Sequence, residues 1–217
     1  MTTLRVAYHE ALENTESDLN ILGALIVDSL HHAVKAVETS DAALSARIIA
    51  GADQTAYSGR RIESTCIELI WRQQPLADEL RLVTTMYEIS NDLQRIDYYV
   101  TDIAKHAVRL AEKPPNAPRE TFRGIARLSE DNLKNAMRAF KERDLQLARD
   151  VTEHVEQYER QYTKGIRALQ KAISADAEIL PAATELLFIC TSLQRINEHA
   201  SNISWHTSEM LDPEAQA

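Results

Sequence analysis

Two sets of polar side chains have the spacing of a row along one face of a helix. The later set is Gln194, Glu198 and Asn202, and the earlier set, 100 residues before it, is Gln94, Tyr98 and Asp102. A step of four residues turns an α-helix by about 40° beyond a full turn, so each set forms a polar stripe. Carboxylate and amide oxygens are the ligands that hard cations prefer. Each row is therefore interpreted either as part of a metal site or as a solvated helix face.

The two rows lie in a repeated stretch of the chain. Residues 93–104 read LQRIDYYVTDIA and residues 193–204 read LQRINEHASNIS, with five identities in register. A match of this length at a fixed offset predicts a tandem duplication. In each copy the apolar residues follow a 3-4-3 spacing, which is typical of a helix whose apolar stripe faces other helices.

The repeat extends to earlier parts of each half. Asp41, Leu44 and Ile48 match, at an offset of 103, Asp144, Leu147 and Val151. The helical spacing of apolar residues predicts six long helices, over residues 4–38, 42–72, 75–111, 119–140, 145–173 and 178–210. Either Asp41 or Ser40 is the candidate N-cap of the second helix, and Asp144 is that of the fifth. Pro75 is expected in the first turn of the third helix.

A proline-rich segment divides the chain. Three of its six prolines fall between residues 112 and 118, which predicts a linker between two halves of similar length. We expect a first three-helix repeat over residues 1–112, the linker over 113–118, a second repeat over 119–211 and a C-terminal tail over 212–217. The predicted fold is all-α, with two tandem three-helix bundles of up-down-up topology.

Composition limits the class of function. The 217 residues include only five glycines and 6% aromatics, which fits long helices better than many strands. A net charge of −9 without a Lys/Arg cluster argues against nucleic acid as a ligand. Cys66 and Cys190 stand alone in apolar helical patterns, as reduced thiols of a cytoplasmic protein do. The N-terminus lacks a signal-peptide pattern and the apolar runs are short, so we expect membrane contact only through protein partners.

Three motifs in this order resemble those of the PhoU family of phosphate-signalling proteins. Residues 72–81, RQQPLADELR, are similar to its QQPVAxDLR turn, and the repeated stretches resemble its LERIGDxxxNIA and LERIxDHAxNI motifs. The similarity runs from about residue 4 to residue 208. The resemblance implies a negative regulator of phosphate uptake and of the phosphate-starvation response. It also implies that the protein is a homodimer and that it is not an enzyme. Such a regulator acts as an adaptor between the ATPase of the phosphate ABC transporter and a sensor histidine kinase.

The resemblance also implies metal sites, since several family members hold multinuclear clusters on the second and third helices of each bundle. The matching positions that keep a usable ligand are Asp53 and Asp102 in the first half, and Glu156, Glu159, Gln194, Glu198 and Asn202 in the second. Clusters need several anionic ligands, and replacement of a carboxylate by an amide removes one negative charge. We therefore expect no certain cofactor and at most one weak site for a single divalent ion (Mg, Mn, Zn or Fe), in the second half.

Two other interpretations stay open at this point. One is a metal-binding helical bundle with a storage or enzymatic role, although the Glu-x-x-His pairs of di-iron bundles are not reproduced. The other is a purely structural or dimerisation module, in which the polar rows form helix–helix hydrogen bonds. A Gly-rich phosphate loop is missing, so nucleotide hydrolysis is not expected. The partner-binding residues cannot be identified from the pattern.

Overall fold

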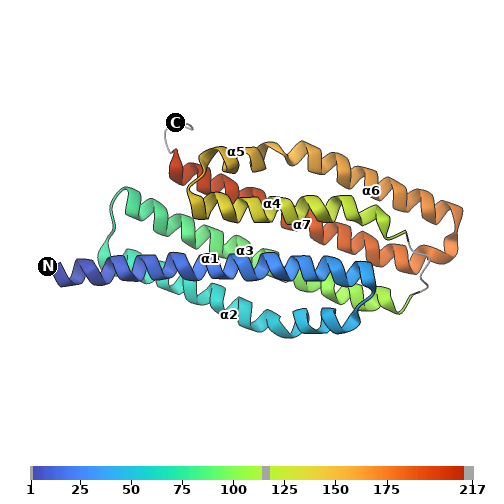
Figure 1. Cartoon of the computed structure of the whole chain (residues 1–217), viewed down its shortest axis with the longest axis horizontal. Coiled ribbons are helices and arrows are strands. Elements are labelled where there is room, and N and C mark those ends of the chain that lie inside the picture. Colours follow the sequence, from blue (N-terminus) through green and yellow to red (C-terminus); the bar gives the residue numbers. More distant parts are fainter. Residues whose placement is uncertain (1, 114–117, 213–217) are drawn as a thin grey trace.

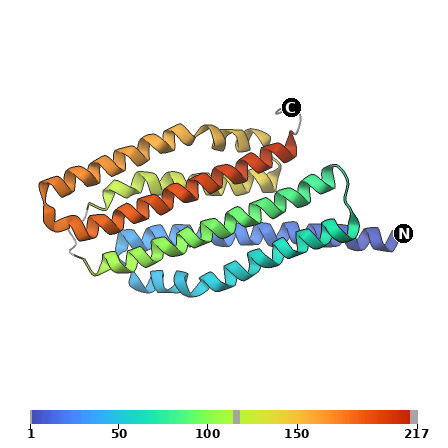
Figure 2. The ribbon, with the colours of Figure 1, turned by 180° about the vertical axis from the view of Figure 1, so that it is seen from behind.

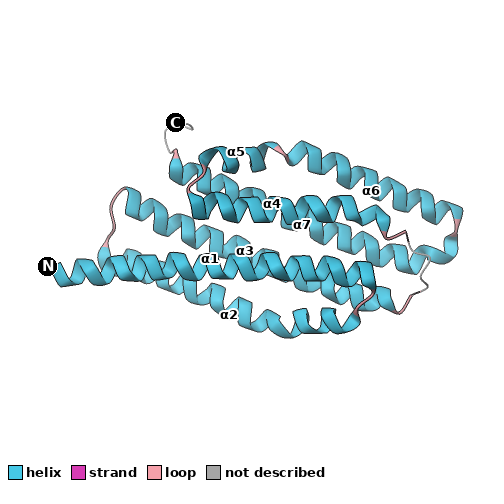
Figure 3. Cartoon of the chain, in the orientation of Figure 1, coloured by secondary structure: helices cyan, strands magenta, loops and turns pink. Residues whose placement is uncertain are grey.

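The computed structural model describes residues 2–113 and 118–212, with side chains from residue 6 onward. Within these ranges the chain is almost entirely helical and has no strand (Figure 3). Its elements are α1 (Thr2–Thr39), α2 (Ala42–Gln73), α3 (Asp78–Ala111), α4 (Glu120–Glu142), α5 (Leu145–Glu153), α6 (Val155–Ala175), the 3₁₀ turn η1 (Ala177–Ile179) and α7 (Leu180–Leu211). The all-α prediction is confirmed.

The helices form two bundles that lie side by side (Figure 1). The first contains α1, α2 and α3, and the second contains α4, α5, α6 and α7. The most extensive contact between helices is that of α3 with α7, which run antiparallel along one face (Figure 2); α1 and α4 meet on the opposite face. The two tandem three-helix bundles expected from the repeat are therefore present, with α3 and α7 joining them along their length.

Matching caps begin the second helix of each bundle. The Asp41 carboxylate accepts a hydrogen bond from the Leu44 N–H at 2.9 Å, and Asp144 accepts one from the Leu147 N–H at 2.9 Å. A side-chain oxygen at this position satisfies an N–H that has no partner inside the helix. Both predicted N-caps are confirmed.

The expected start of the third helix at Pro75 is wrong. Gln74 and Ala77 have φ angles of 47° and 48°, and α3 begins only at Asp78. Positive φ is costly for residues with a side chain and cannot continue a right-handed helix. The Gln74 N–H closes α2 by donating to the Ile70 carbonyl at 3.1 Å, so Pro75 lies in a turn between the two helices.

The helix expected over residues 145–173 is divided into α5 and α6. His154 has φ −74° and ψ 0°, which departs from the ψ near −42° of a regular helix and tilts its peptide group away from the axis. The hydrogen bond from the Tyr158 N–H to the His154 carbonyl, 3.1 Å, still spans the division. The single interruption therefore bends the segment without ending it.

The repeated stretches form the centre of the core. The apolar positions of their 3-4-3 stripes are fully buried: Leu93, Ile96, Val100, Ile103, Leu193, Ile196, Ala200 and Ile203. Cys66 and Cys190 are free and buried, and burial raises the pKa of each thiol to about 12. By length and hydropathy alone the described stretch Ala177–Leu211 could cross a membrane, yet half of its most apolar window is buried inside the protein. It is thus accounted for as a core helix.

Candidate functional site

The polar row of the first repeat is divided between two neighbouring helices. The Gln94 amide donates to Glu63 on α2, whereas Asp102 accepts from the Ser192 hydroxyl on α7 at 2.9 Å. Between them, Tyr98 is 63% exposed. Because two steps of four residues turn the helix by about 80°, one end of the row faces α2 and the other faces α7. Asp53 is exposed on α2, which does not contact α7, so Asp53 and Asp102 are not brought together.

Two of the five candidate ligands of the second repeat are paired with arginines on their own helices. Glu156 lies 3.3 Å from Arg160, and Glu198 lies 2.7 Å from Arg195. Glu159 is exposed on α6 and Gln194 is half-buried on α7. Asn202 faces the other repeat. The described residues include no group of three or more His, Cys, Asp or Glu side chains placed to hold a metal ion. The metal assignment therefore stays a prediction.

The contact of α3 with α7, here called the α3–α7 seam, carries two polar clusters. In the first, Asp92 of α3 is surrounded by three side chains of α7. His199 Nδ1 lies 2.7 Å from Asp92 Oδ1, His206 Nε2 lies 3.7 Å from Asp92 Oδ2, and the Asn202 amide donates to Asp92 Oδ1 at 3.4 Å. The His199 ring also stacks on Tyr99 of α3. A buried carboxylate of one repeat is thus satisfied by the other.

The second cluster lies further along the same seam. His106 Nδ1 of α3 is 2.6 Å from Glu185 of α7, and Arg109 Nε is 3.1 Å from the same carboxylate. Burial alone raises the pKa of Glu185, but the hydrogen bonds from His106 and Arg109 outweigh it and lower that pKa below its ordinary value. His106 also stacks on Phe188.

Sequence reasoning missed Asp92, His106, Glu185 and His206 as members of this seam. One signal was available, because His106 and His206 recur at the same offset of 100 residues as the repeated stretch. The antiparallel pairing of the two equivalent helices places each of these histidines beside a carboxylate of the other repeat.

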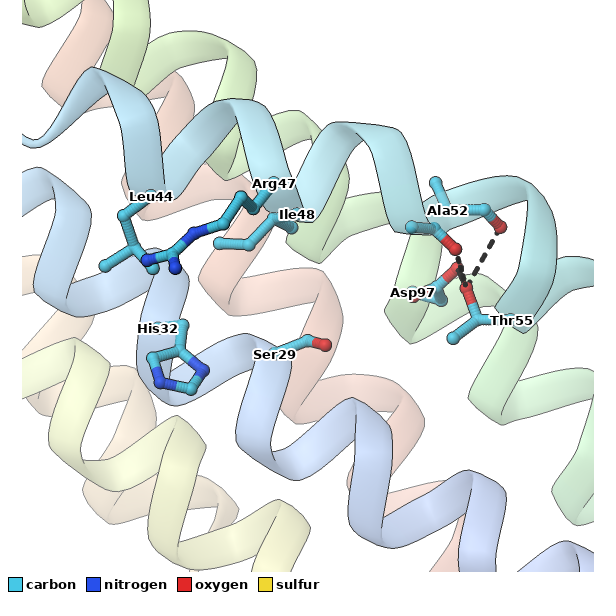
Figure 4. A pocket seen from close by; sticks show the side chains of 9 residues that line it. Ser29, His32, Leu44, Arg47, Ile48, Ala52, Thr55 and Asp97 are labelled. Atoms are coloured by element: carbon cyan, nitrogen blue, oxygen red, sulfur yellow. Dashed lines mark hydrogen bonds between the residues drawn. The ribbon is translucent and has the colours of Figure 1, made fainter.

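A cavity of about 260 Å³ opens between α1, α2 and α3 (Figure 4), and we call it the first-repeat cavity. Its polar lining residues are Ser29, His32, Arg47, Thr55 and Asp97. Arg47 and His32 lie at one end, and Asp97 and Thr55 lie at the other. The Thr55 hydroxyl is 2.6 Å from Asp97 Oδ2. Burial raises the pKa of Asp97, against the lowering effect of the Thr55 hydrogen bond. Ser29, His32, Arg47 and Thr55 were not selected from the sequence as ligands.

Curated relatives resemble the chain over most of its length. It is 29% identical to the phosphate-specific transport system accessory protein PhoU homolog of Pseudomonas putida over 199 residues, 91% of this chain and 77% of that protein. The homolog from Clostridium acetobutylicum is 28% identical over 209 residues, 95% of each chain.

Solved structures share the fold. The crystal structure of PhoU from Pseudomonas aeruginosa matches with a TM-score of 0.90 and 25% identity, covering 95% of this chain and 99% of that one. The phosphate transport system regulatory protein PhoU from Streptococcus pneumoniae matches with a TM-score of 0.87 and 23% identity, covering 95% and 98%.

The PhoU domain model matches the chain twice, over residues 19–107 and 122–205. One match falls in each bundle, while the residue boundaries expected for the repeats, linker and tail stay predictions; residues 114–117 and 213–217 lie outside the described chain. With both repeats matched, the chain belongs to the PhoU family.

Proposed function

We propose that this protein is a negative regulator of phosphate uptake and of the phosphate-starvation response. The observation that carries the proposal is the match of the PhoU domain to both repeats. The curated relatives are named as accessory proteins of the phosphate-specific transport system, which supports a role beside that transporter. In this role the protein is cytoplasmic and homodimeric, and it reaches the membrane only through protein partners.

The proposed mechanism is contact rather than catalysis. The protein acts as an adaptor that binds the ATPase of the phosphate ABC transporter and a sensor histidine kinase. Large apolar side chains stand exposed around the turn between α2 and α3: Ile67 at 56%, Trp71 at 76% and Leu76 at 80%. Exposed aromatic and aliphatic side chains in one region favour a protein-binding surface. We therefore propose the surface around the turn between α2 and α3 as the first candidate for a partner-binding site.

Co-purification tests the adaptor role. A tagged copy expressed in the host at its natural level is expected to retain the transporter ATPase, and the kinase in a second preparation. Trp71→Ala combined with Leu76→Ser is expected to weaken at least one of these contacts, and Tyr57→Ser, also exposed on α2, serves as the matched control. Retention of neither protein, in cells grown with abundant phosphate, would contradict the adaptor role.

A further inference from the structure

The first-repeat cavity lies where two buried side chains of the second repeat are larger than their counterparts in the first. The offset of 103 that aligns the capped helix starts pairs Ser29 with Asn132 and Thr55 with Tyr158, and both counterparts are buried. Tyr158 is among the largest fully buried side chains of the protein. The same place in the fold is thus filled by side chains in one repeat and left as a cavity of about 260 Å³ in the other.

The inner end of the cavity holds a carboxylate that accepts few hydrogen bonds from the protein. Asp97 is 8% exposed. The single hydroxyl hydrogen of Thr55 has two close acceptors, Asp97 Oδ2 at 2.6 Å and the Ala52 carbonyl at 2.9 Å. Asp97 therefore receives at most one hydrogen bond from Thr55, and burial of a carboxylate without compensating charge is costly.

The second repeat shows that this position does not require a charge. At the offset of 100 the counterpart of Asp97 is Asn197, which accepts a hydrogen bond from the Asn132 amide in a buried neutral pair. In the first repeat Ser29 replaces Asn132, and the carboxylate faces open space instead. A cationic or strongly donating group in that space would satisfy the carboxylate.

The other end of the cavity has the opposite charge. Arg47 extends from α2 toward His32 of α1, at the end away from Asp97 (Figure 4). Among the described residues it makes no ion pair, while His32 Nδ1 lies 3.2 Å from Asp28. Arg47 and Thr55 are eight residues apart on one helix, a rise of about 12 Å. The wall between the two ends is largely apolar, with Leu44, Ile48 and Ala52.

We propose that the first-repeat cavity binds a short linear zwitterion. Its ammonium group contacts Asp97 and Thr55, its carboxylate or phosphate monoester contacts Arg47, and its methylene chain lies along Ile48 and Ala52. An arginine at one end and a carboxylate at the other select a molecule with both charges at a fixed separation. This site does not depend on the role proposed above in phosphate regulation.

Calorimetric titration of the whole protein tests the proposal with two probes, 6-aminohexanoate for the carboxylate form and 3-aminopropyl phosphate for the phosphate form. Hexylamine and hexanoate each carry one end only. We expect at least one zwitterion to bind with a single saturable site, and more tightly than either single-ended molecule. The tighter zwitterion identifies the anionic group. If neither zwitterion saturates the protein at concentrations up to about 10 mM, far above the dissociation constants of ordinary ligands, the proposal is overturned.

Two substitutions of residues that line the cavity make the test specific. Asp97→Asn removes the charge that binds the ammonium group, and Ala52→Val takes up space needed by the methylene chain. Each is expected to weaken binding by about tenfold or more, the first as for the loss of a hydrogen bond to a charged group. Glu68→Gln, which removes an exposed carboxylate from the same helix, is the matched control and is expected to bind like the parent. Circular dichroism confirms that each variant is folded. Unchanged affinity in Asp97→Asn, or equal weakening in Glu68→Gln, would overturn the assignment.

Discussion

His199 of α7 lies with its Nδ1 atom 2.7 Å from Asp92 Oδ1 of α3, and the two side chains are only 22% and 11% exposed. The pair therefore joins the two repeats where solvent screens it little. Sequence separation of the partners is 107 residues, so the contact forms only when both bundles are in place. The strength of this contact therefore reports on the interaction between the two repeats.

A double-mutant cycle over Asp92→Asn and His199→Gln tests this contact. We expect a coupling energy of about 1–2 kcal/mol in urea unfolding near neutral pH, since a shielded hydrogen bond to a charged group is lost. The exposed pair of Glu156 and Arg160 on α6 serves as the control, with a coupling of about 0.3–0.5 kcal/mol. Equal coupling in both pairs would mean that the seam contact contributes no more than a surface ion pair.

Two glycines should respond in opposite directions to the same change. A Cβ at Gly51 would meet nothing within 4 Å, whereas at Gly165 it would lie 2.9 Å from the Thr121 carbonyl and 2.8 Å from the Ile125 side chain. Gly51→Ala is expected to stabilise the protein by about 0.5–1 kcal/mol because alanine favours the helix. Gly165→Ala is expected to destabilise it by about 1–3 kcal/mol, because α4 must move away. Thermal unfolding of both variants checks the pair.

The sequence was sufficient to predict the helices and the buried stripes, because period and capping are local properties. Leu93, Ile196 and the other positions of the two apolar stripes are buried as the 3-4-3 spacing predicts, and Asp41 and Asp144 cap their helices as expected. The direction of Asp102 toward α7 was not predictable, since α3 is flanked by both α2 and α7 and spacing alone does not say which neighbour a residue meets.

The departures from the predicted helices also could not be derived from residue type and spacing alone. The positive φ at Ala77 and the division at His154 each involve one residue whose type does not demand that conformation. The cavity beside Asp97 follows from a difference in side-chain volume between the repeats. It becomes visible only when the helices are placed against each other.

Asp97→Asn should change the pH dependence of stability. Burial raises the pKa of Asp97 above its ordinary value of 3.8. The folded protein therefore binds more protons than the unfolded chain between the two pKa values, and the stability that this group contributes falls as pH rises through that window. The variant is expected to gain about 1 kcal/mol over the parent near pH 7, and less as the pH approaches 4. A gain that is independent of pH in urea unfolding would contradict this account.

The predicted metal site in the second repeat can be tested by dialysis against Mn²⁺ followed by elemental analysis. Because Glu198 and Glu156 are paired with arginines, we expect at most about one weakly held ion per chain, lost in Glu198→Gln. Asp53→Asn serves as the control in the first repeat, where Asp53 and Asp102 lie apart. Two or more tightly held ions per chain would show that the carboxylates rearrange into a cluster.

Regulation of the phosphate response is tested most directly by the activity of a phosphate-starvation promoter in a strain that lacks this gene. In medium with abundant phosphate, deletion of the gene is expected to raise the activity of the promoter to the level seen in phosphate-starved cells. Reintroduction of the intact gene is expected to restore repression. Deletion that leaves the promoter repressed in abundant phosphate would contradict the account.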